Sequence, residues 1–259
     1  MRKVLFVLAA VAGLLATALV IAPAQWIAST LKDATGGRVE LAEARGTAWN
    51  GSAVLVLASS PDPAAARATL PERLSWRLSP WSLLVGQIDL TVTHPSALSQ
   101  PLAVRAPLLG GGGTILSATT LRLPASLLVG LGAPWNTVRP GGILLVTWDR
   151  LQIGSDRIQG NLSAEWQFAS SALTPVSPMG HYRLQTNGVW PGTQLDLLTI
   201  SGPLELKGSG TIAAGGRLRF TGRAQAMPGT DPGVKAQLTG LISLLGRRDG
   251  EGALLNFGG

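Results

Sequence analysis

Apolar and polar residues alternate with a period of two along much of the chain after residue 38. Five segments show the alternation clearly: 73–78, 87–93, 158–168, 204–212 and 217–226. Successive side chains of a β-strand point to opposite faces, so each segment predicts a strand with one apolar and one polar face. Trp166 and Phe168 are two positions apart, and we expect both on the apolar face.

Glycine-containing turn signals separate these segments. They are Asn50-Gly51, Gly110 to Gly113, Gly141-Gly142 and Gly215-Gly216. Glycine adopts positive φ at little cost, and Asn50-Gly51 favours a type I′ turn that Trp49 would hold against the core. Connections this short join antiparallel neighbours. We therefore predict a mainly β fold with a predominantly antiparallel, meander-type β-sheet domain.

Helix signals are few. Residues 80–84 and 124–131 each suit a single turn or a short helix. A stronger signal begins at Asp231-Pro232, an N-cap followed by a first-turn proline, and Gly246 would end it. We therefore predict a helix near residues 231–245. Its apolar face would consist of Val234, Leu238, Leu241 and Leu245.

The apolar face of the predicted sheet has to be covered. Three ways are open: folding into a sandwich or barrel, packing on the short helices, or holding a ligand. Trp76, Trp148 and Trp166 fall at inward strand positions. We interpret them as core filling, and the alternative is a sheet that stacks sugars or bases on its aromatic rings.

An uncharged apolar run covers residues 4–22 and directly follows Arg2-Lys3. As a helix it would be about 28 Å long, close to the thickness of a bilayer core. A cation pair ahead of such a span is expected to stay in the cytoplasm. We predict a cytoplasmic N-terminus over residues 1–3, a single-pass inner-membrane anchor over 4–22 and a periplasmic β-rich domain over 23–259.

A cleaved signal peptide is the alternative, because Ala22-Pro23-Ala24 has the small-x-small form of a cleavage site. The apolar run is longer than the usual signal core, and proline is a poor residue within such a site. Trp26 also lies where an interfacial anchor would lie. These features favour a retained anchor.

The amino-acid composition excludes several further classes of protein and of functional site. Charged residues make up only 14% of the chain, which argues against disorder, and the 33 glycines and 17 prolines argue against a helical bundle. Cysteine is absent, which excludes disulfides, thiolate zinc sites and cysteine nucleophiles. The formal charge of +7 would suit a polyanion or an anionic membrane surface. After the start of the chain only Arg247-Arg248 are adjacent basic residues, so we expect no nucleic-acid binding.

No motif for catalysis is present. The sequence lacks a G-x-S-x-G elbow, a P-loop, an HExxH helix and an EF-hand loop. A G-x-G-x-x-A pattern at 208–213 lies inside a predicted strand and opens no helix, so we interpret its glycines as packing positions. His94 and His181 are interpreted as surface or edge histidines.

The acidic residues give no reason to expect an acid–base pair. General acid–base chemistry needs two groups brought together in a cleft, and nothing in the spacing of these carboxylates indicates that. We therefore predict that the protein is not an enzyme and that it has no catalytic, cofactor-binding or metal-binding residues. The carboxylates considered are Glu40, Glu43, Asp149, Glu165, Asp196 and Glu205.

Several segments follow the apolar run in a characteristic order. They cover residues 39–41, 45–51, 74–80, 121–124 and 244–250. The most specific are G-T-x-W-x-G at 46–51 and W-x-L-x-P at 76–80. In these features essentially the whole chain resembles the type II secretion system protein N family, also called general secretion pathway protein N.

The resemblance implies a bitopic inner-membrane protein of Gram-negative bacteria. Its periplasmic part would assist the machine that exports folded proteins across the outer membrane, with no enzymatic activity and no cofactor. Its implied partners are other proteins of that machine, in the inner-membrane platform or the outer-membrane secretin. The alternative is an AsmA-like lipid-binding or lipid-transfer protein, whose apolar β groove would hold acyl chains. An exported hydrolase is a third class, and the sequence contains no motif that supports it.

Overall fold

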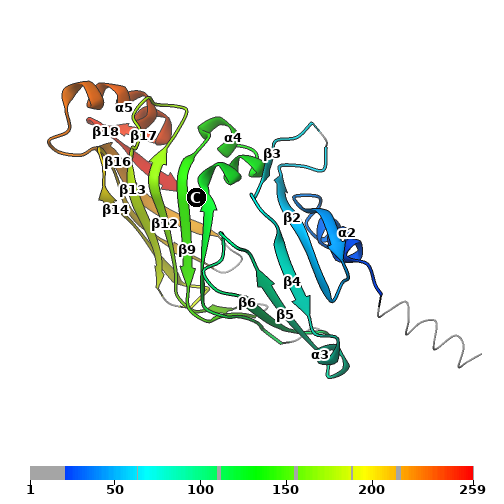
Figure 1. Ribbon diagram of the computed structural model, residues 1–259. Coiled ribbons are helices and arrows are strands. Elements are labelled where there is room, and N and C mark those ends of the chain that lie inside the picture. Colours follow the sequence, from blue (N-terminus) through cyan, green and yellow to red (C-terminus); the bar gives the residue numbers. More distant parts are fainter. Residues whose placement is uncertain are drawn as a thin grey trace, which may run out of the picture.

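The computed structural model describes residues 21–62, 64–109, 112–154, 157–187, 189–213 and 217–258. Over these residues the chain forms two antiparallel sheets of nine strands each, with short helices at their ends and between them (Figure 1). The predicted mainly β, antiparallel fold is confirmed.

The first sheet contains most of the N-terminal half of the chain. Its strands run in the order β1-β2-β4-β5-β6-β7-β10-β11, and β3 pairs with β2 beyond the end of β4. The bounds are β1 (Val39–Gly46), β2 (Asn50–Ala58), β3 (Arg67–Thr69), β4 (Leu74–Leu78), β5 (Gln87–Thr93), β6 (Leu102–Pro107), β7 (Thr114–Leu116), β10 (Leu151–Ile153) and β11 (Ile158–Gln159).

The second sheet contains the C-terminal strands in the order β17-β18-β16-β15-β14-β13-β12-β9-β8. The bounds are β8 (Thr119–Pro124), β9 (Gly141–Trp148), β12 (Leu162–Ser170), β13 (Gly180–Asn187), β14 (Thr193–Ser201), β15 (Leu204–Ile212), β16 (Leu218–Ala226), β17 (Arg247–Asp249) and β18 (Gly252–Phe257). The chain enters this sheet at β8 and β9, returns to the first sheet for β10 and β11, and then stays in the second. The G-x-G-x-x-A pattern lies in and directly after β15, as predicted.

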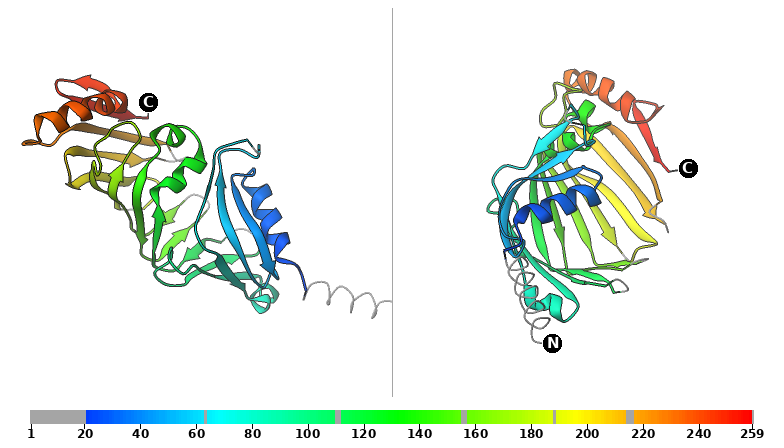
Figure 2. Two further views of the ribbon diagram at one scale, coloured as in Figure 1. Left: turned by 45° about the horizontal axis from the view of Figure 1, so that its top comes forward. Right: turned by 90° about the vertical axis from the view of Figure 1, so that its right-hand side faces the viewer.

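Five short helices accompany the sheets over the described residues: α2 (Ala24–Ala34), α3 (Pro80–Leu84), the 3₁₀ helix η1 (Ala125–Leu131), α4 (Trp135–Val138) and α5 (Pro232–Leu245). The predictions of α3, η1 and α5 are confirmed. The sequence did not predict α2 or α4. η1 contacts β2, β3 and β9, so it joins the two sheets at one end (Figures 1 and 2).

α5 begins and ends where the capping residues predict. The carboxylate of Asp231 accepts hydrogen bonds from the amides of Gly233 and Val234, and Gly246 stands at the C-cap. Leu238 and Leu241 are buried on the face that packs against the second sheet. Helix packing therefore covers part of the apolar sheet face. The core beneath α5 includes Ala169, Met179, Tyr182, Leu204 and Ala253.

The predicted anchor over residues 4–22 falls almost wholly outside the described residues, which begin at Ile21. Within the part of the chain that is described, no helix combines the length and the apolar character that crossing a membrane requires.

The prediction of a type I′ turn at Asn50-Gly51 is wrong. Both residues lie in β2, and the connection from β1 consists of residues 47–49, with the amide of Thr47 donating to the carbonyl oxygen of Asn50 at 3.0 Å. Gly46 supplies the positive φ of this hairpin. The turn signals at 110–113 and 215–216 include residues outside the described part of the chain.

Gly51 is required by packing. A Cβ atom at this position would collide with the indole ring of Trp76, which lies directly across the β2–β4 pair. Trp76 is only 4% exposed, and its indole nitrogen donates to the carbonyl oxygen of Ala48 at 3.1 Å. The prediction that Trp76 fills the core is confirmed. Trp76 ties the β1–β2 hairpin to the sheet.

Trp76 anchors a cluster that also attaches α2 to the first sheet. Ala24 of α2, Ala53 of β2 and Trp76 are buried together, and Ile27 packs against them. Trp166 plays a similar part in the second sheet, where it packs against the α5 core and its ring centroid lies 6.0 Å from that of Tyr182. Its predicted inward position is confirmed.

Replacing Trp76 by alanine should lower the free energy of unfolding by about 3 to 5 kcal/mol, because a large cavity would form against Gly51. Chemical denaturation of the full chain in detergent would measure the change. Leu244→Ala is the control, since Leu244 is 71% exposed on α5. An equal effect of the two substitutions would contradict the assignment of Trp76 as the anchor of the cluster.

Candidate functional site

A β-bulge in β12 turns Phe168 to the outer, polar face of the second sheet. The pairing of β12 with β13 and with β9 shifts register around Phe168, whose φ is +51°. Trp166 and Ala169 both pack in the core, so the residues between them lie on the opposite face. Phe168 is 66% exposed. The prediction that Phe168 shares the apolar face with Trp166 is therefore wrong.

Gly142 makes this bulge possible. It lies in β9 opposite the bulge, with φ of +96°, and a Cβ atom there would collide with the carbonyl oxygens of Gln167 and Phe168. The prediction of a turn at Gly141-Gly142 is wrong, because both residues belong to β9. Gly142 does need positive φ, but the reason is the bulge in the neighbouring strand β12, and not a turn.

A second irregularity places more apolar surface beside Phe168. His181 pairs with Ser201 and Tyr182 pairs with Thr199, so Ile200 is the extra residue of a bulge in β14. Ile200 and Leu198 are both exposed, and Leu198 pairs with Arg183 across the β13–β14 ladder. We name this area of the outer face the Phe168 surface; it comprises Phe168, Leu198, Ile200, Glu165, His181 and Arg183.

An ion-pair network holds the polar part of the Phe168 surface in place. Glu165 accepts from Arg183 Nε at 2.8 Å, and Arg183 Nη2 lies 2.7 Å from the same carboxylate oxygen. The other oxygen lies 3.3 Å from His181 Nε2 and accepts from Gln167 Nε2 at 3.2 Å. Desolvation acts to raise the pKa of Glu165, but the hydrogen bonds from Arg183, Gln167 and His181 outweigh it and lower that pKa below its usual value.

This network has no features of a catalytic centre. Glu165 is one carboxylate with basic partners, and a hydrolytic pair would need a second acid or a nucleophile beside it. In contrast, aromatic side chains and arginine are enriched in protein–protein interfaces, and this surface exposes Phe168 beside Arg183. The surface is therefore suited to binding another protein.

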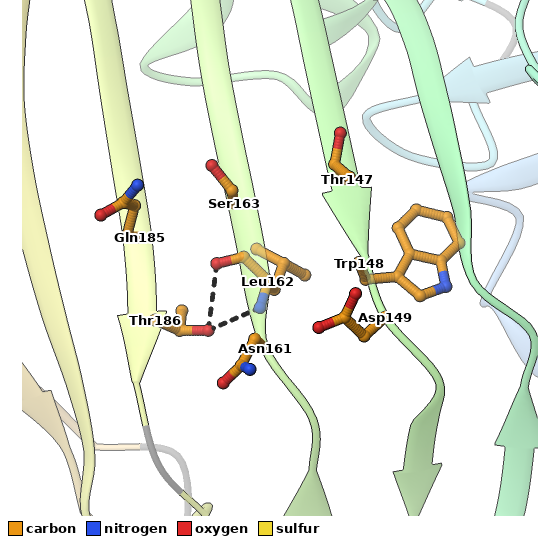
Figure 3. Close-up of a pocket in the computed structure, with 8 residues that line it drawn as sticks. All are labelled: Thr147, Trp148, Asp149, Asn161, Leu162, Ser163, Gln185 and Thr186. Carbon is orange, nitrogen blue, oxygen red and sulfur yellow. Dashed lines mark hydrogen bonds between the residues drawn. The ribbon is translucent and has the colours of Figure 1, made fainter.

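A shallow pocket of about 250 Å³ lies on the same sheet, among the ends of β9, β12 and β13 (Figure 3). Its volume is below the range of about 300–1,000 Å³ that is typical of ligand sites. Trp148 lines it, but the indole nitrogen donates to the carbonyl oxygen of Ser117 at 2.9 Å, which fixes the ring. Asp149 is its only acidic lining residue. The lining residues are Thr147, Trp148, Asp149, Asn161, Leu162, Ser163, Gln185 and Thr186.

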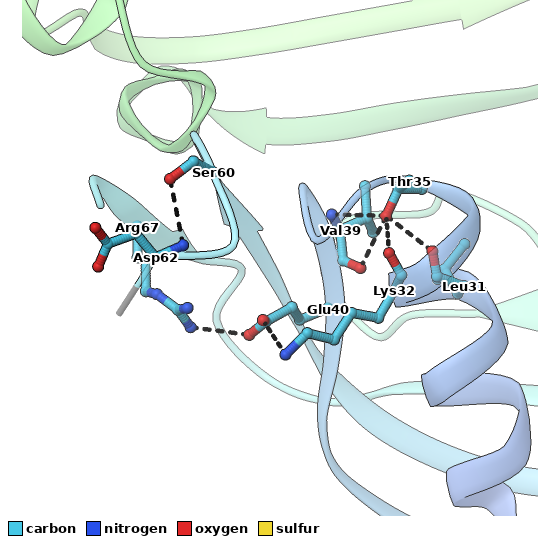
Figure 4. A network of polar contacts seen from close by, with 8 residues as sticks. All are labelled: Leu31, Lys32, Thr35, Val39, Glu40, Ser60, Asp62 and Arg67. Atoms are coloured by element: carbon cyan, nitrogen blue, oxygen red, sulfur yellow. Dashed lines mark hydrogen bonds and ion pairs between the residues drawn. The ribbon is translucent and has the colours of Figure 1, made fainter. Parts of the chain in front are cut away.

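Glu40 belongs to a structural network in the first sheet (Figure 4). Its carboxylate lies 2.8 Å from Lys32 Nζ of α2 and 2.8 Å from Arg67 Nη1 of β3. The hydrogen bond from Lys32 is the main cause of its lowered pKa, and the charge of Arg67 adds to it against an opposing desolvation effect. The network joins α2, β1 and β3, so it serves the fold.

The other carboxylates that the sequence analysis considered are also dispersed. Glu43 pairs with Arg73, and Glu205 accepts a hydrogen bond from Gln225 on the neighbouring strand. Asp196 lines a shallow polar depression across β14, β15 and β16. Across the residues that the structure describes, no three acidic or histidine side chains gather in a way that could hold a metal ion.

The two histidines differ. His181 lies at the start of β13, an internal strand of the second sheet, and its partly buried ring joins the Glu165 network. His94 is only 6% exposed, and its Nδ1 accepts hydrogen bonds from the amides of Ser96 and Ala97. The prediction of a surface position for His94 is wrong, because the ring is buried where it caps the turn after β5.

The sheet edges offer little room for an added strand. The segment around Leu98 covers the edge of β8, and Trp190 exchanges two backbone hydrogen bonds with Ile158 at the edge of β11. β17 has only three residues, all of them charged. A bulge interrupts β1, against which α2 packs. Short, charged, covered and bulged edges are the devices by which native sheets avoid edge pairing.

Comparison with known proteins gives one family. A family model described as type II secretion system (T2SS), protein N, matches residues 37–255. No curated protein and no solved structure is similar enough to count as a match. The matched range runs from just before β1 to within β18, so it includes both sheets and the Phe168 surface.

Glu165→Gln should reduce the free energy of unfolding by about 1 kcal/mol near neutral pH, because a charge-assisted hydrogen bond on a partly exposed face is lost. The pKa of Glu165 is lowered on folding. The carboxylate therefore makes its full contribution to the free energy of unfolding above the usual carboxyl pKa of about 4.3, and it loses that contribution as the pH falls through the pKa of Glu165 in the folded protein. Denaturation as a function of pH would measure this. Arg183→Gln should show the same loss, and a pH-independent difference would contradict the role of the network.

Proposed function

This chain belongs to the type II secretion system protein N family, and we propose that it acts without catalysis, through protein contacts made in the periplasm. Membership implies an accessory component of type II secretion, and it supports a location in the bacterial envelope. The single observation that carries the proposal is the match over residues 37–255. In the proposed role, the protein supports export of folded proteins across the outer membrane.

The Phe168 surface is the proposed contact site. Two bulges place Phe168 and Ile200 on a face that is otherwise polar, and bulges of this kind often re-aim a side chain for function. The neighbouring Glu165–Arg183 pair gives the surface a fixed charge pattern, which favours selection among partners. The proposed partner is another protein of the same machine, in the inner-membrane platform or the secretin.

An enzymatic role has less support. The family is a family of secretion accessory components and is not known for enzymes. The pocket of Figure 3 is small and holds one carboxylate, and the Glu165 network lacks a nucleophile. The comparisons also give no support to the lipid-transfer alternative, and α5 already covers part of the apolar sheet face.

The proposed location is the inner membrane, with residues 1–3 in the cytoplasm, a single span over 4–22 and the β-rich domain over 23–259 in the periplasm. The uncharged run after Arg2-Lys3 supports this arrangement. The described chain begins at the hairpin end of the first sheet, where the carbonyl oxygen of Ala22 accepts from the amide of Ala48 at 2.8 Å. A span ending there would lead directly into the domain.

Deletion of the gene in a cell that carries the secretion system should leave folded cargo in the periplasm, while export across the inner membrane continues. Fractionation and immunoblotting of a secreted cargo would measure this. Complementation with the full chain is the control. Normal cargo release under several growth conditions would contradict the accessory role.

Phe168→Asn should weaken the proposed contact and leave the fold intact, because asparagine tolerates positive φ better than most residues do. Loss of an aromatic hot spot costs about 2 kcal/mol or more, which is about 30-fold in affinity. Crosslinking yield to other components and cargo release would measure the effect. Leu244→Asn is the control, because Leu244 is also exposed but lies on α5. If the two variants show the same crosslinking yield and cargo release, Phe168 is not part of the contact.

Intact mass of the membrane-extracted protein should correspond to a chain that begins at or near Met1, because the apolar run is long and the site at Ala22-Pro23-Ala24 is a poor substrate. N-terminal sequencing gives an independent measurement. A mature start at Gln25 in a soluble periplasmic fraction would contradict the retained anchor.

A further inference from the structure

A group of apolar side chains is exposed at one tip of the first sheet. Trp81 and Leu84 on α3 are 76% and 77% exposed, which is unusual for residues of this size. Nearby, Val85 and Leu109 are 73% and 83% exposed, and Leu108 is 45% exposed. We name the group the apolar tip; it comprises Trp81, Leu84, Val85, Leu108 and Leu109.

The two segments of the apolar tip lie side by side. α3 connects β4 to β5, and residues 108 and 109 follow β6, the neighbour of β5. The amide of Leu108 donates to the carbonyl oxygen of Gly86 at 2.8 Å, directly after α3. Their exposed side chains therefore form one patch. A contiguous apolar patch on a protein surface marks a site of contact with another surface.

The described chain begins at this same end of the sheet. Ala22 is hydrogen-bonded to Ala48 in the β1–β2 hairpin, and the carbonyl oxygen of the next residue, Trp49, accepts from the amide of Leu78 at 2.8 Å. Leu78 ends β4, and α3 begins at Pro80. In Figure 1, α3 and the start of the described chain both lie toward the lower right.

The sequence on the N-terminal side of this point is apolar. Residues 4–22 contain no charge, and Ile21 and Trp26, on either side of Ala22, are exposed. An anchor over 4–22 would therefore leave the bilayer beside the apolar tip. A surface held at that position faces the lipid headgroups.

We propose that the apolar tip is a second membrane contact, which inserts into the surface of the phospholipid bilayer beside the N-terminal anchor. The inference rests on the membrane anchoring proposed above. Tryptophan concentrates at membrane interfaces, where its ring lies at the level of the headgroups. Trp81 takes that position, and Leu84, Val85 and Leu109 enter the acyl boundary beneath it.

The backbone of the tip suits such an environment. Insertion into lipid is costly for unpaired backbone groups. The amide of Val85 donates to Ser82 at 3.2 Å, that of Gly86 donates to Leu83 at 3.1 Å, and Ser79 caps the helix by accepting from the amide of Ser82. Residues 78–88 and 106–109 contain no charged side chain, so insertion buries no charge.

The absence of cysteine from the chain allows a clean labelling experiment. Leu84→Cys introduces a single thiol, which is labelled with an environment-sensitive fluorophore in the full-length protein. The protein is then reconstituted into phosphatidylcholine vesicles that contain some phosphatidylglycerol, with and without lipids brominated near the headgroup. Leu244→Cys is the matched control, because Leu244 is 71% exposed and lies on α5, which packs against the second sheet.

We expect the fluorescence emission of the label at Leu84 to shift to the blue and to be quenched by brominated lipid. We expect neither effect for the label at Leu244. Adding Trp81→Ser and Val85→Ser to Leu84→Cys should reduce the quenching of the label. The variant should still float with the vesicles, because its N-terminal anchor is unchanged. Circular dichroism checks that each variant is folded.

Three results would overturn the proposal. In the first, the label at Leu84 stays in water although the full chain floats with the vesicles. In the second, both labels are quenched equally, which indicates nonspecific adsorption. In the third, the emission of the label at Leu84 shifts to the blue but brominated lipid does not quench it, which indicates that a second copy or another protein covers the tip.

Cargo release in the deletion strain is a separate measurement, so these results leave the accessory role untouched. Failure of the full chain to float would overturn both the anchor and the tip contact.

Discussion

Each sheet has one apolar face, and the need to cover these two faces organises the molecule. In the first sheet, Trp76 fills the space above Gly51 and brings α2 against β1 and β2. In the second sheet, α5 lies over Tyr182 and Leu204, and η1 joins the two sheets. The helices are short, so the cover is partial, and many strand residues stay only half-buried. The small helices therefore do more for the fold than their length suggests.

The strands could be predicted because a period of two is a local signal, and α5 could be predicted because its cap and its apolar face lie within one short segment. The division into two sheets could not be predicted in this way. β10 and β11 return to the first sheet after β9 has joined the second, and only pairing between distant segments determines that path. α2 was missed because the apolar residues that it contacts lie on β1, β2 and β4.

The glycines show most clearly where a prediction from one short segment of sequence fails. Asn50-Gly51 has the composition of a tight turn, yet Gly51 is in a strand because Trp76 needs its space. Gly142 does have positive φ, but its partner is a bulge on the next strand. The same bulge moves Phe168 out of the apolar alternation that the sequence predicts. In each case the decisive contact crosses between strands, and the composition of one segment contains no information about it.

The two proposed contact surfaces lie at different ends of the protein. The apolar tip lies at the hairpin end of the first sheet, where the described chain begins, whereas the Phe168 bulge lies where β12 meets the α5 core of the second sheet (Figures 1 and 2). A domain held to the bilayer at both its anchor and its tip would have less freedom to swing than one held by a single span. Its second sheet would then project away from the membrane in a restricted set of orientations. Such pre-orientation lowers the entropic cost of a protein contact at the Phe168 surface, because part of the rotational freedom is already lost before the partner binds.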